Sequence, residues 1–349
     1  MFVALRDLRA ARGRFLLITL VVAMVALLVS FLSGLTAGLA HQNISAVQKL
    51  SGATVVFADT GADPSFDSSV LTAEQVRTWQ RAGGRADPIG ISRGQAGRDG
   101  VAPVQVAIFG VDGTVFGDRV ATESGTVVLS RAAADRLSAA PGARVTIGAQ
   151  TFTVAEIGDD DWYAHTPVVW TTLADWQQLT PRGGAATILA ASGTHDIDAL
   201  NGAAHTRTTS ADGSLRAIGS YQAENGSLTL MTVLLFVISA LVIGAFFTVW
   251  TIQRAPDVAT LKALGATTGS LIRDALGQAL IVLLIGVGIG VGVTAVAGAF
   301  IGGNVPFVLG IATTVLPALA LIGLGLLGAV FALRFLVTAD PLTALDQSR

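Results

Sequence analysis

Four apolar runs, each long enough to cross a lipid bilayer, dominate this chain of 349 residues. A hydrocarbon core of roughly 30 Å requires about 20 consecutive apolar residues in a helix. The runs cover residues 15–40, 228–252, 275–300 and 308–337. The last run is the longest and is expected to be tilted or to begin outside the bilayer. Because hydrophobic residues make up 52% of the chain and charged residues only 13%, composition also indicates a membrane protein.

Basic residues near the ends of the runs predict the orientation of the chain. They gather in residues 1–14, 253–274 and 334–349, which are therefore expected in the cytoplasm, with both termini on that side. The long polar region 41–227 is then expected outside the membrane. It carries 13 of the 22 basic and 19 of the 24 acidic residues, hence a net charge of −6 against +4 for the rest of the chain.

The N-terminal end has two open interpretations. Residues 1–14 are a basic amphipathic segment that either lies along the inner membrane surface or is only a positively charged flank. The first apolar run could be a cleaved signal peptide, since Gly38-Leu39-Ala40 resembles a cleavage site. A retained anchor is favoured, because the run is longer than the apolar core of a typical signal peptide. The chain has no cysteine, so the outer region is expected to fold without disulfides.

The outer region alternates strand and helix signals. Strands are predicted over residues 53–57, 104–109, 126–130 and 167–170, and a hairpin over 144–147 and 151–154. Helices are predicted over 131–139, with Ser130 as the N-cap, and over 173–179. The predicted fold class is an α-helical membrane protein with four transmembrane helices and an α/β extracytoplasmic domain between helices 1 and 2.

Residues 253–274 form a charged interruption between the second and third runs. Within them, Val258, Leu261 and Leu264 recur at i, i+3 and i+6, which predicts a short helix over 255–264 with one apolar face. Pro256 is expected in its first turn, where a missing backbone N–H is tolerated. A short amphipathic helix between two spans presents a docking surface to a soluble protein.

This interruption resembles the coupling segment of ABC transporter permeases of the FtsX/MacB type. The matching run begins at Asp257, continues through Leu261-Lys262-Ala263-Leu264 and ends with Gly265-Ala266-Thr267. The resemblance implies that a cytoplasmic ATPase subunit contacts a set of residues here: Asp257, Val258, Leu261, Lys262 and Leu264. It also implies a MacB-type fold for the outer domain, and a homodimer in which each copy docks on one ATPase.

The chain carries no motif for catalysis or nucleotide binding. It has no GxxxxGK(S/T) loop, no GxSxG sequence and no metal motif of defined spacing, and the near-zero net charge gives no indication of nucleic acid. No enzymatic activity and no intrinsic cofactor are therefore expected, and ATP is expected on the partner subunit. The glycines at 286, 288, 290 and 292 form two overlapping GxxxG pairs, which indicate helix packing. Residues 159–161 are three aspartates; a solvated loop is favoured over a cation site.

The entry to the second run holds candidate ligands for a substrate. If its helix continues backwards, Tyr221, Glu224, Leu228 and Met231 share one face at i, i+3, i+7 and i+10. Tyrosine and methionine are known axial ligands of haem iron, and a carboxylate is a further oxygen ligand. Plainer interpretations remain open: Tyr221 as an interfacial aromatic, Glu224 as a first-turn carboxylate and Met231 as a core filler.

The blocks Tyr221-Gln222-Ala223-Glu224, 31–40 and 238–247 resemble the haem-exporting permeases of the HrtB type, although the DevC-type exporters share much of this pattern. The resemblance implies haem as the substrate, taken sideways from the bilayer at the two-fold axis of the dimer. Apolar residues are then expected around the ring, and a carboxylate or thioether near the iron. The candidates are Phe31, Leu35 and Leu228 for the ring, Glu224 or Met231 for the iron, and Tyr221, Met24 and His41 as further lining residues.

Three alternatives remain open. The chain could export another amphiphile, such as a lipid, lipoprotein or drug, or it could be an FtsX-like regulator of a cell-wall hydrolase. It could also be a membrane receptor without an ATPase. All of these place it in the bacterial plasma membrane, in contact with lipid.

Overall fold

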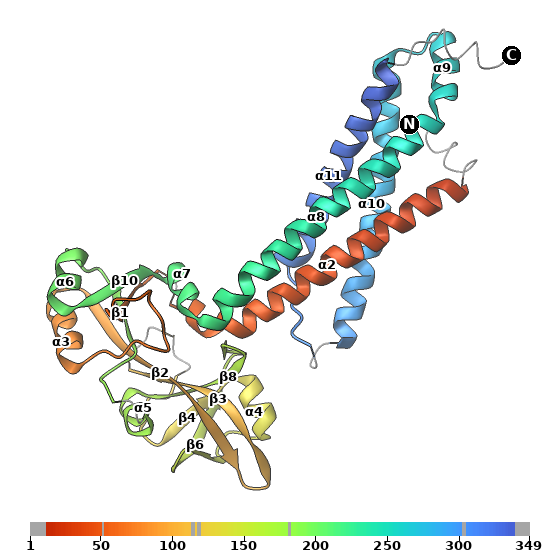
Figure 1. The fold of residues 1–349 in the computed structure, drawn as a ribbon. Coiled ribbons are helices and arrows are strands. Elements are labelled where there is room, and N and C mark those ends of the chain that lie inside the picture. Colours follow the sequence, from red (N-terminus) through yellow and green to blue (C-terminus); the bar gives the residue numbers. More distant parts are fainter. Residues whose placement is uncertain are drawn as a thin grey trace. The chain divides into compact units, whose positions relative to one another are not determined.

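The computed structural model describes residues 12–50, 52–112, 116, 120–180, 183–301 and 305–338. Most of the predicted N-terminal segment 1–14 and of the tail 338–349 lies outside the described residues. The chain divides into two compact units, one of residues 39–226 and one that combines residues 1–38 with 227–349 (Figure 1). The first corresponds to the outer domain expected over 41–227. The second contains the four apolar runs, except for residues 39 and 40 at the end of the first run.

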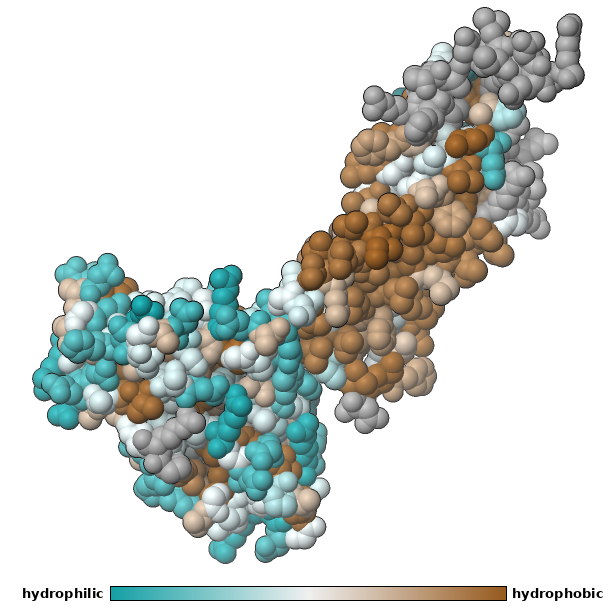
Figure 2. Space-filling view, viewed as in Figure 1, coloured by the Kyte–Doolittle hydropathy of each residue, from teal (hydrophilic) through white to brown (hydrophobic). Residues whose placement is uncertain are grey.

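The helical unit is built from long apolar helices. They are α2 (Arg12–Gln48), α8 (Gly219–Gln253), α10 (Thr268–Ile301) and α11 (Ile311–Thr338), with the short α9 (Ala255–Ala263) between α8 and α10. Each of the four long helices is long and apolar enough to cross a membrane. Apolar residues cover much of the surface of this unit that Figure 2 shows, as lipid contact requires.

The long helices do not end where the apolar runs end. The sequence predicts an end near Ala40, but α2 continues to Gln48, because Ile44 and Val47 are buried in the core of the outer domain. Likewise, α8 begins at Gly219, well before the apolar run at residue 228. Hydropathy marks where a helix enters lipid, whereas backbone hydrogen bonding continues wherever the side chains find other partners.

Glycines let α10 approach α2 closely. A Cβ added at Gly290 would lie 2.5 Å from the carbonyl oxygen of Ala23, and one at Gly286 would lie 2.7 Å from Cγ1 of Val22. Gly288 and the glycine at 292 have nothing within 4 Å. The packing predicted from the overlapping GxxxG pairs is therefore confirmed for one pair, whereas the other pair has no partner in the described part of the chain.

The outer domain is a mixed sheet with helices on it. Its strand order is β10-β1-β9-β2-β3-β8-β4-β6-β5, and β7 pairs with β8 beside this path. The strands are β1 (Thr54–Ala58), β2 (Arg85–Arg98), β3 (Val101–Val111), β4 (Thr126–Leu129), β5 (Arg144–Ile147), β6 (Gln150–Ile157), β7 (Trp162–Tyr163), β8 (Thr166–Thr172), β9 (Ile188–Ser192) and β10 (Thr206–Ser210). The pairs β3–β8 and β4–β6 are parallel, and the other pairs are antiparallel.

The long hairpin β2–β3 connects two groups of helices (Figure 1). The helices are α3 (Ala73–Arg81), α4 (Arg131–Leu137), α5 (Leu173–Leu179), α6 (Ile197–Ala204), α7 (Ala211–Ser214) and the 3-10 helix η1 (Leu215–Ala217). α3 and α6 cover a core around β1 and β9, and α4 and α5 cover a second core around β3, β4 and β6. On the opposite face of the sheet, the end of α2 packs into a third core that includes Phe57, Phe109 and Trp170.

Local sequence signals predict much of this domain. Oγ of Ser130 accepts the N–H of Ala133 at 3.3 Å, so its role as the cap of α4 is confirmed. This helix ends at Leu137 and not at residue 139, because Ser138 adopts the left-handed conformation with φ 48°. The helix predicted over 173–179 and the hairpin of β5 and β6 are confirmed. The sequence patterns above do not predict strands β2, β9 and β10 or helices α3, α6 and α7.

Gly290→Ala should lower the unfolding free energy of the helical unit by about 1–3 kcal/mol, because the added methyl meets the backbone of α2. Gly288→Ala is the matched control: it lies in the same helix and faces open space, so it should be neutral or slightly stabilising. Unfolding in detergent would measure both. Equal stability of the two variants would contradict the packing of α10 on α2.

Candidate functional site

Glu224, near the start of α8, is paired within its own chain. Its Oε1 lies 2.9 Å from Nε2 of His165, and its Oε2 accepts a hydrogen bond of 3.0 Å from Nδ2 of Asn43. The side chains of Glu224 and His165 are both partly exposed. The carboxylate is therefore reachable from solvent but already has two partners.

Asn43 joins these groups from the part of α2 that lies beyond the apolar run. It is fully buried, its Nδ2 lies 3.0 Å from Nε2 of His165, and its Oδ1 accepts a hydrogen bond of 2.6 Å from Oγ of Ser220. Both ends of the amide are therefore used, as a buried asparagine requires. We call Asn43, His165, Ser220 and Glu224 the Asn43 cluster.

The turn that carries His165 has an uncommon backbone. Ala164 and His165 connect β7 to β8, and both adopt positive φ angles, 46° and 62°, that residues other than glycine rarely take. The end of α2 holds this turn: the N–H of Ala164 donates to the carbonyl of Asn43 at 3.0 Å, and that of His165 donates to Gln42 at 2.9 Å. The position of the imidazole is thus fixed by backbone as well as side-chain contacts.

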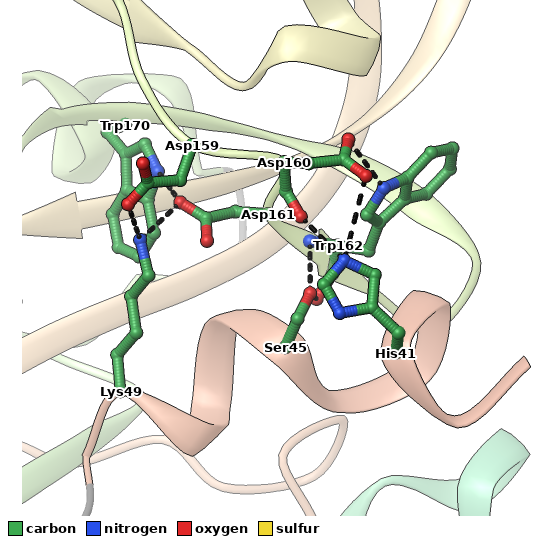
Figure 3. Close-up of polar contacts among 8 residues, drawn as sticks. All are labelled: His41, Ser45, Lys49, Asp159, Asp160, Asp161, Trp162 and Trp170. Atoms are coloured by element: carbon green, nitrogen blue, oxygen red, sulfur yellow. Dashed lines mark hydrogen bonds and ion pairs between the residues drawn. The ribbon is translucent and has the colours of Figure 1, made fainter. Parts of the chain in front are cut away.

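The prediction of a solvated loop for the three aspartates at 159–161 is confirmed for Asp159 and Asp160, which are exposed, and is wrong for Asp161, which is buried (Figure 3). Nζ of Lys49 lies 3.2 Å from the carboxylate of Asp159 and 2.7 Å from that of Asp161. The side chain of Asp161 is only 4% exposed, and it also accepts a hydrogen bond from the indole of Trp170 at 3.1 Å. A charge this deeply buried is tolerated because a cation and a donor compensate it.

His41, a predicted substrate residue, belongs to the same contact. Its Nε2 lies 2.9 Å from the carbonyl oxygen of Asp160 and 3.6 Å from the carboxylate. The hydrogen bond with His41 holds the pKa of Asp160 below its usual range, against the opposing effect of burial. Across the described residues, no group of three or more histidines or acids is arranged to hold a metal ion. The loop and Trp162, which follows it, contact His41 and Ser45 of α2 and Lys49, the residue directly after this helix.

The other substrate candidates are distributed over both units. Tyr221 packs against the core of the outer domain. In the helical unit, Met231 and Met24 are 56% and 57% exposed, and Leu228 and Leu35 are half-buried. Phe31 contacts Phe307, with ring centroids 5.3 Å apart. The helix predicted backwards from the second run is confirmed, so Tyr221, Glu224, Leu228 and Met231 do lie along one helix.

The predicted coupling helix is present as α9, with Pro256 in its first turn. Its apolar residues do not share one face, because Val258 and Lys262 line a small cavity with Leu333 of α11. Leu261 and Leu264, in contrast, are 42% and 79% exposed. The side chain of Asp257 lies outside the described residues. The exposed apolar surface of this region therefore consists of Leu261 and Leu264.

Comparison with protein families assigns both parts of the chain. Residues 15–206 match the MacB-like periplasmic core domain, and residues 213–341 match the FtsX-like permease C-terminal domain. The extracytoplasmic region of MacB from Actinobacillus actinomycetemcomitans is a similar solved structure, with 13% identity, 50% of this chain and 97% of that chain covered, and a TM-score of 0.38. The extracellular domain of YknZ from Gram-positive bacteria is another, with 10% identity, 45% and 98% covered, and a TM-score of 0.33.

Relatives match the chain over its whole length. The putative hemin transport system permease protein HrtB of Staphylococcus haemolyticus is 24% identical over 349 residues, 99% of each chain. The protein of the same name from Staphylococcus epidermidis is 24% identical over 356 residues, again 99% of each chain. An ABC transporter permease of Mycobacterium tuberculosis is 30% identical over 118 residues, 34% of this chain and 33% of that protein.

Lys49→Met should lower the unfolding free energy of the outer domain by about 3 kcal/mol, because it leaves the carboxylate of Asp161 buried without its cation. Lys49→Arg keeps the charge and should cost much less. Adding Asp161→Asn to Lys49→Met should restore part of the loss, as a double-mutant cycle in chemical denaturation would measure. Additive effects of the two substitutions would contradict a direct coupling.

The lowered pKa of Asp160 predicts a pH dependence. Since the folded state favours the ionised carboxylate, this stabilisation is fully present above the ordinary pKa of 3.8 and is lost as the pH falls through the lower, folded-state pKa. The stability of the wild type should therefore fall more steeply below about pH 4 than that of Asp160→Asn. Denaturation of both proteins at a series of pH values would test this, and parallel curves would contradict it.

Proposed function

Since the chain belongs to the ABC transporter permeases that join a MacB-like periplasmic core domain to an FtsX-like C-terminal permease domain, we propose that it exports haem. In this proposal it forms the permease subunit of an efflux transporter in the bacterial plasma membrane, with both termini in the cytoplasm. A separate ATPase subunit, implied by the family, supplies the energy. The observation that carries the haem assignment is full-length similarity, over both domains, to relatives named as hemin transport permeases.

Two exposed apolar stripes support a site for a flat, apolar substrate. On α2, Leu20, Met24 and Leu28 are exposed, and Phe31 and Leu35 continue the same face. On α8, Met231, Leu234 and Ile238 form a second exposed stripe that begins near Leu228. We propose that two copies of the chain face each other across these stripes and hold haem between them, among side chains that lipid covers otherwise.

The contacts of Glu224 indicate which side chain approaches the iron. Its carboxylate already accepts hydrogen bonds from Asn43 and His165, and ligation would require it to give up partners. Met231 is exposed, and its thioether is a known type of axial ligand. We therefore propose Met231 as the iron ligand. Glu224 and His165 would instead tie the start of α8 to the outer domain.

The proposed mechanism transmits motion from the ATPase through the helices. ATP binding would move α9, on which Leu261 and Leu264 form the exposed apolar surface. The helix α2 carries Asn43, and α8 begins with Ser220 and Glu224 of the same cluster. Because both helices are continuous, a shift of either one would act on the outer domain. Nucleotide then biases a two-state element, and the substrate leaves as the apolar stripes close.

A haem titration of the purified protein in detergent, followed by visible absorption, tests the substrate. The expected result is saturation at about one haem per two chains, with affinity at least tenfold weaker in Met231→Ala. Two control variants should bind haem like the wild type. One is Glu224→Gln, and the other is Val249→Ala, at an exposed position near the C-terminal end of α8. Loss of haem binding in Glu224→Gln but not in Met231→Ala would instead identify the carboxylate of Glu224 as the iron ligand. The absence of a saturable shift would reject haem and favour another amphiphile or a regulatory role.

Replacing Leu261 and Leu264 with glutamate should abolish co-purification with the ATPase subunit, because two buried carboxylates would oppose an apolar contact. The matched variant with methionine at both positions keeps the apolar surface and should retain the partner. Normal co-purification of the glutamate variant would rule out this surface as the docking site.

A further inference from the structure

Strand β2 of the outer domain has a gap along one edge. β9 pairs with this edge over Arg85–Ile89, and β5 pairs with it at Ala96 and Gly97. Both are antiparallel to β2 and lie one after the other along it. Between them, residues 90–95 pair with β3 on the opposite edge, but no strand of the described part of the chain pairs with them on this edge.

The main-chain groups of β2 show which residues face the gap. The carbonyl of Ile89 accepts a hydrogen bond from the N–H of Thr187, and both main-chain groups of Ile91 bond to Oγ1 of Thr187, at 2.8 and 3.1 Å. Alternate residues of an antiparallel strand direct their N–H and C=O groups to the same edge. The main chain of Arg93 and Gln95 is therefore directed into the gap, beyond the reach of the threonine.

A cavity of about 400 Å³ lies at this gap and has walls on both faces of the sheet. One wall contains Phe66 and Tyr163, which belong to the core beneath Ile91. The other contains Trp176 of α5, whose indole N–H donates to Oγ of Ser92 at 3.0 Å. Of β2, the cavity is lined by Ile91, Ser92 and Arg93, so it borders the first part of the unpaired stretch. Nearly buried aromatic side chains lie on both faces of the sheet beside it.

We infer that this gap binds an extended polypeptide segment of a partner protein, added as a short strand beside residues 92–95 of β2. Such a strand satisfies the main chain of Arg93 and Gln95, and its successive side chains alternate between the two aromatic walls. Arg93 and Asp67 form an ion pair of 3.6 Å at the rim, and both side chains are about half exposed. A small apolar molecule would leave the main-chain groups unused. The inference concerns the outer domain and is independent of haem.

Binding of a labelled peptide to the full chain in detergent tests the inference. The probe is a blocked peptide of six residues with alternating threonine and valine, and its counterpart with N-methyl groups on alternate amides is the control, because it cannot pair as a strand. The unmodified peptide should bind in the range up to about 1 mM and the methylated peptide at least about tenfold more weakly. Bound peptide should slow amide exchange at Arg93 and Gln95, while Ser92 and Gly94, already paired with β3, should not change.

Two variants at residue 95 distinguish the contribution of the main chain to peptide binding from that of the side chain. Gln95→Pro removes the N–H that faces the gap, on an edge where proline is tolerated, and should weaken binding about tenfold. Gln95→Ala keeps the N–H and should bind like the wild type. Equal binding of the two peptides, equal binding of the two variants, or no binding at about 1 mM would each overturn the inference. If Gln95→Pro fails to fold, the inference is still tested on the wild type by comparing the unmodified and the methylated peptide and by measuring amide exchange.

Discussion

The relative positions of three segments of the outer domain depend on the hydrogen bonds of one buried amide, the side chain of Asn43. Asn43 lies in α2 after the apolar run has ended. It joins α2 to two segments that are each more than a hundred residues away from it in sequence, the turn at His165 and the start of α8. A buried polar group without partners costs about 1–3 kcal/mol, so none of these segments can move away alone without that cost. The left-handed turn at residues 164–165 persists because the same stretch of α2 holds its backbone.

A neighbouring face of α2 organises the acidic loop in the same way. His41, Ser45 and Lys49 contact residues 159–162, so a single helical segment binds both the loop and the turn that follows it. The two helices that connect the units, α2 and α8, are therefore both fastened to the stretch from Asp159 to His165. This arrangement is compatible with the proposed transmission of helix movement to the outer domain, because the contacts are polar and directional.

The sequence predicts the parts of the fold that local signals determine. The four membrane helices follow from hydropathy, α4 from the cap at Ser130 and the β5–β6 hairpin from its glycine turn. The candidate site is predicted only in part. The sequence identifies Glu224 from its place near the start of α8. Its partners Asn43 and His165 are distant in sequence, and no spacing pattern connects either of them to Glu224. The burial of Asp161 is not predicted for the same reason, because its partner Lys49 lies more than a hundred residues away.

Two pairs of glycines in α10 differ in their surroundings. Gly286 and Gly290 are used, since they let α10 approach α2, whereas Gly288 and the glycine at 292 face open space. Exposed leucine and methionine suit contact with lipid as well as contact with protein. Glycine differs, because it costs roughly 1 kcal/mol relative to alanine in a helix and gains nothing from lipid. Its value in a membrane helix is close approach by another backbone. The open pair therefore leaves a face of α10 that is suited to close helix packing and has no partner within the described part of the chain.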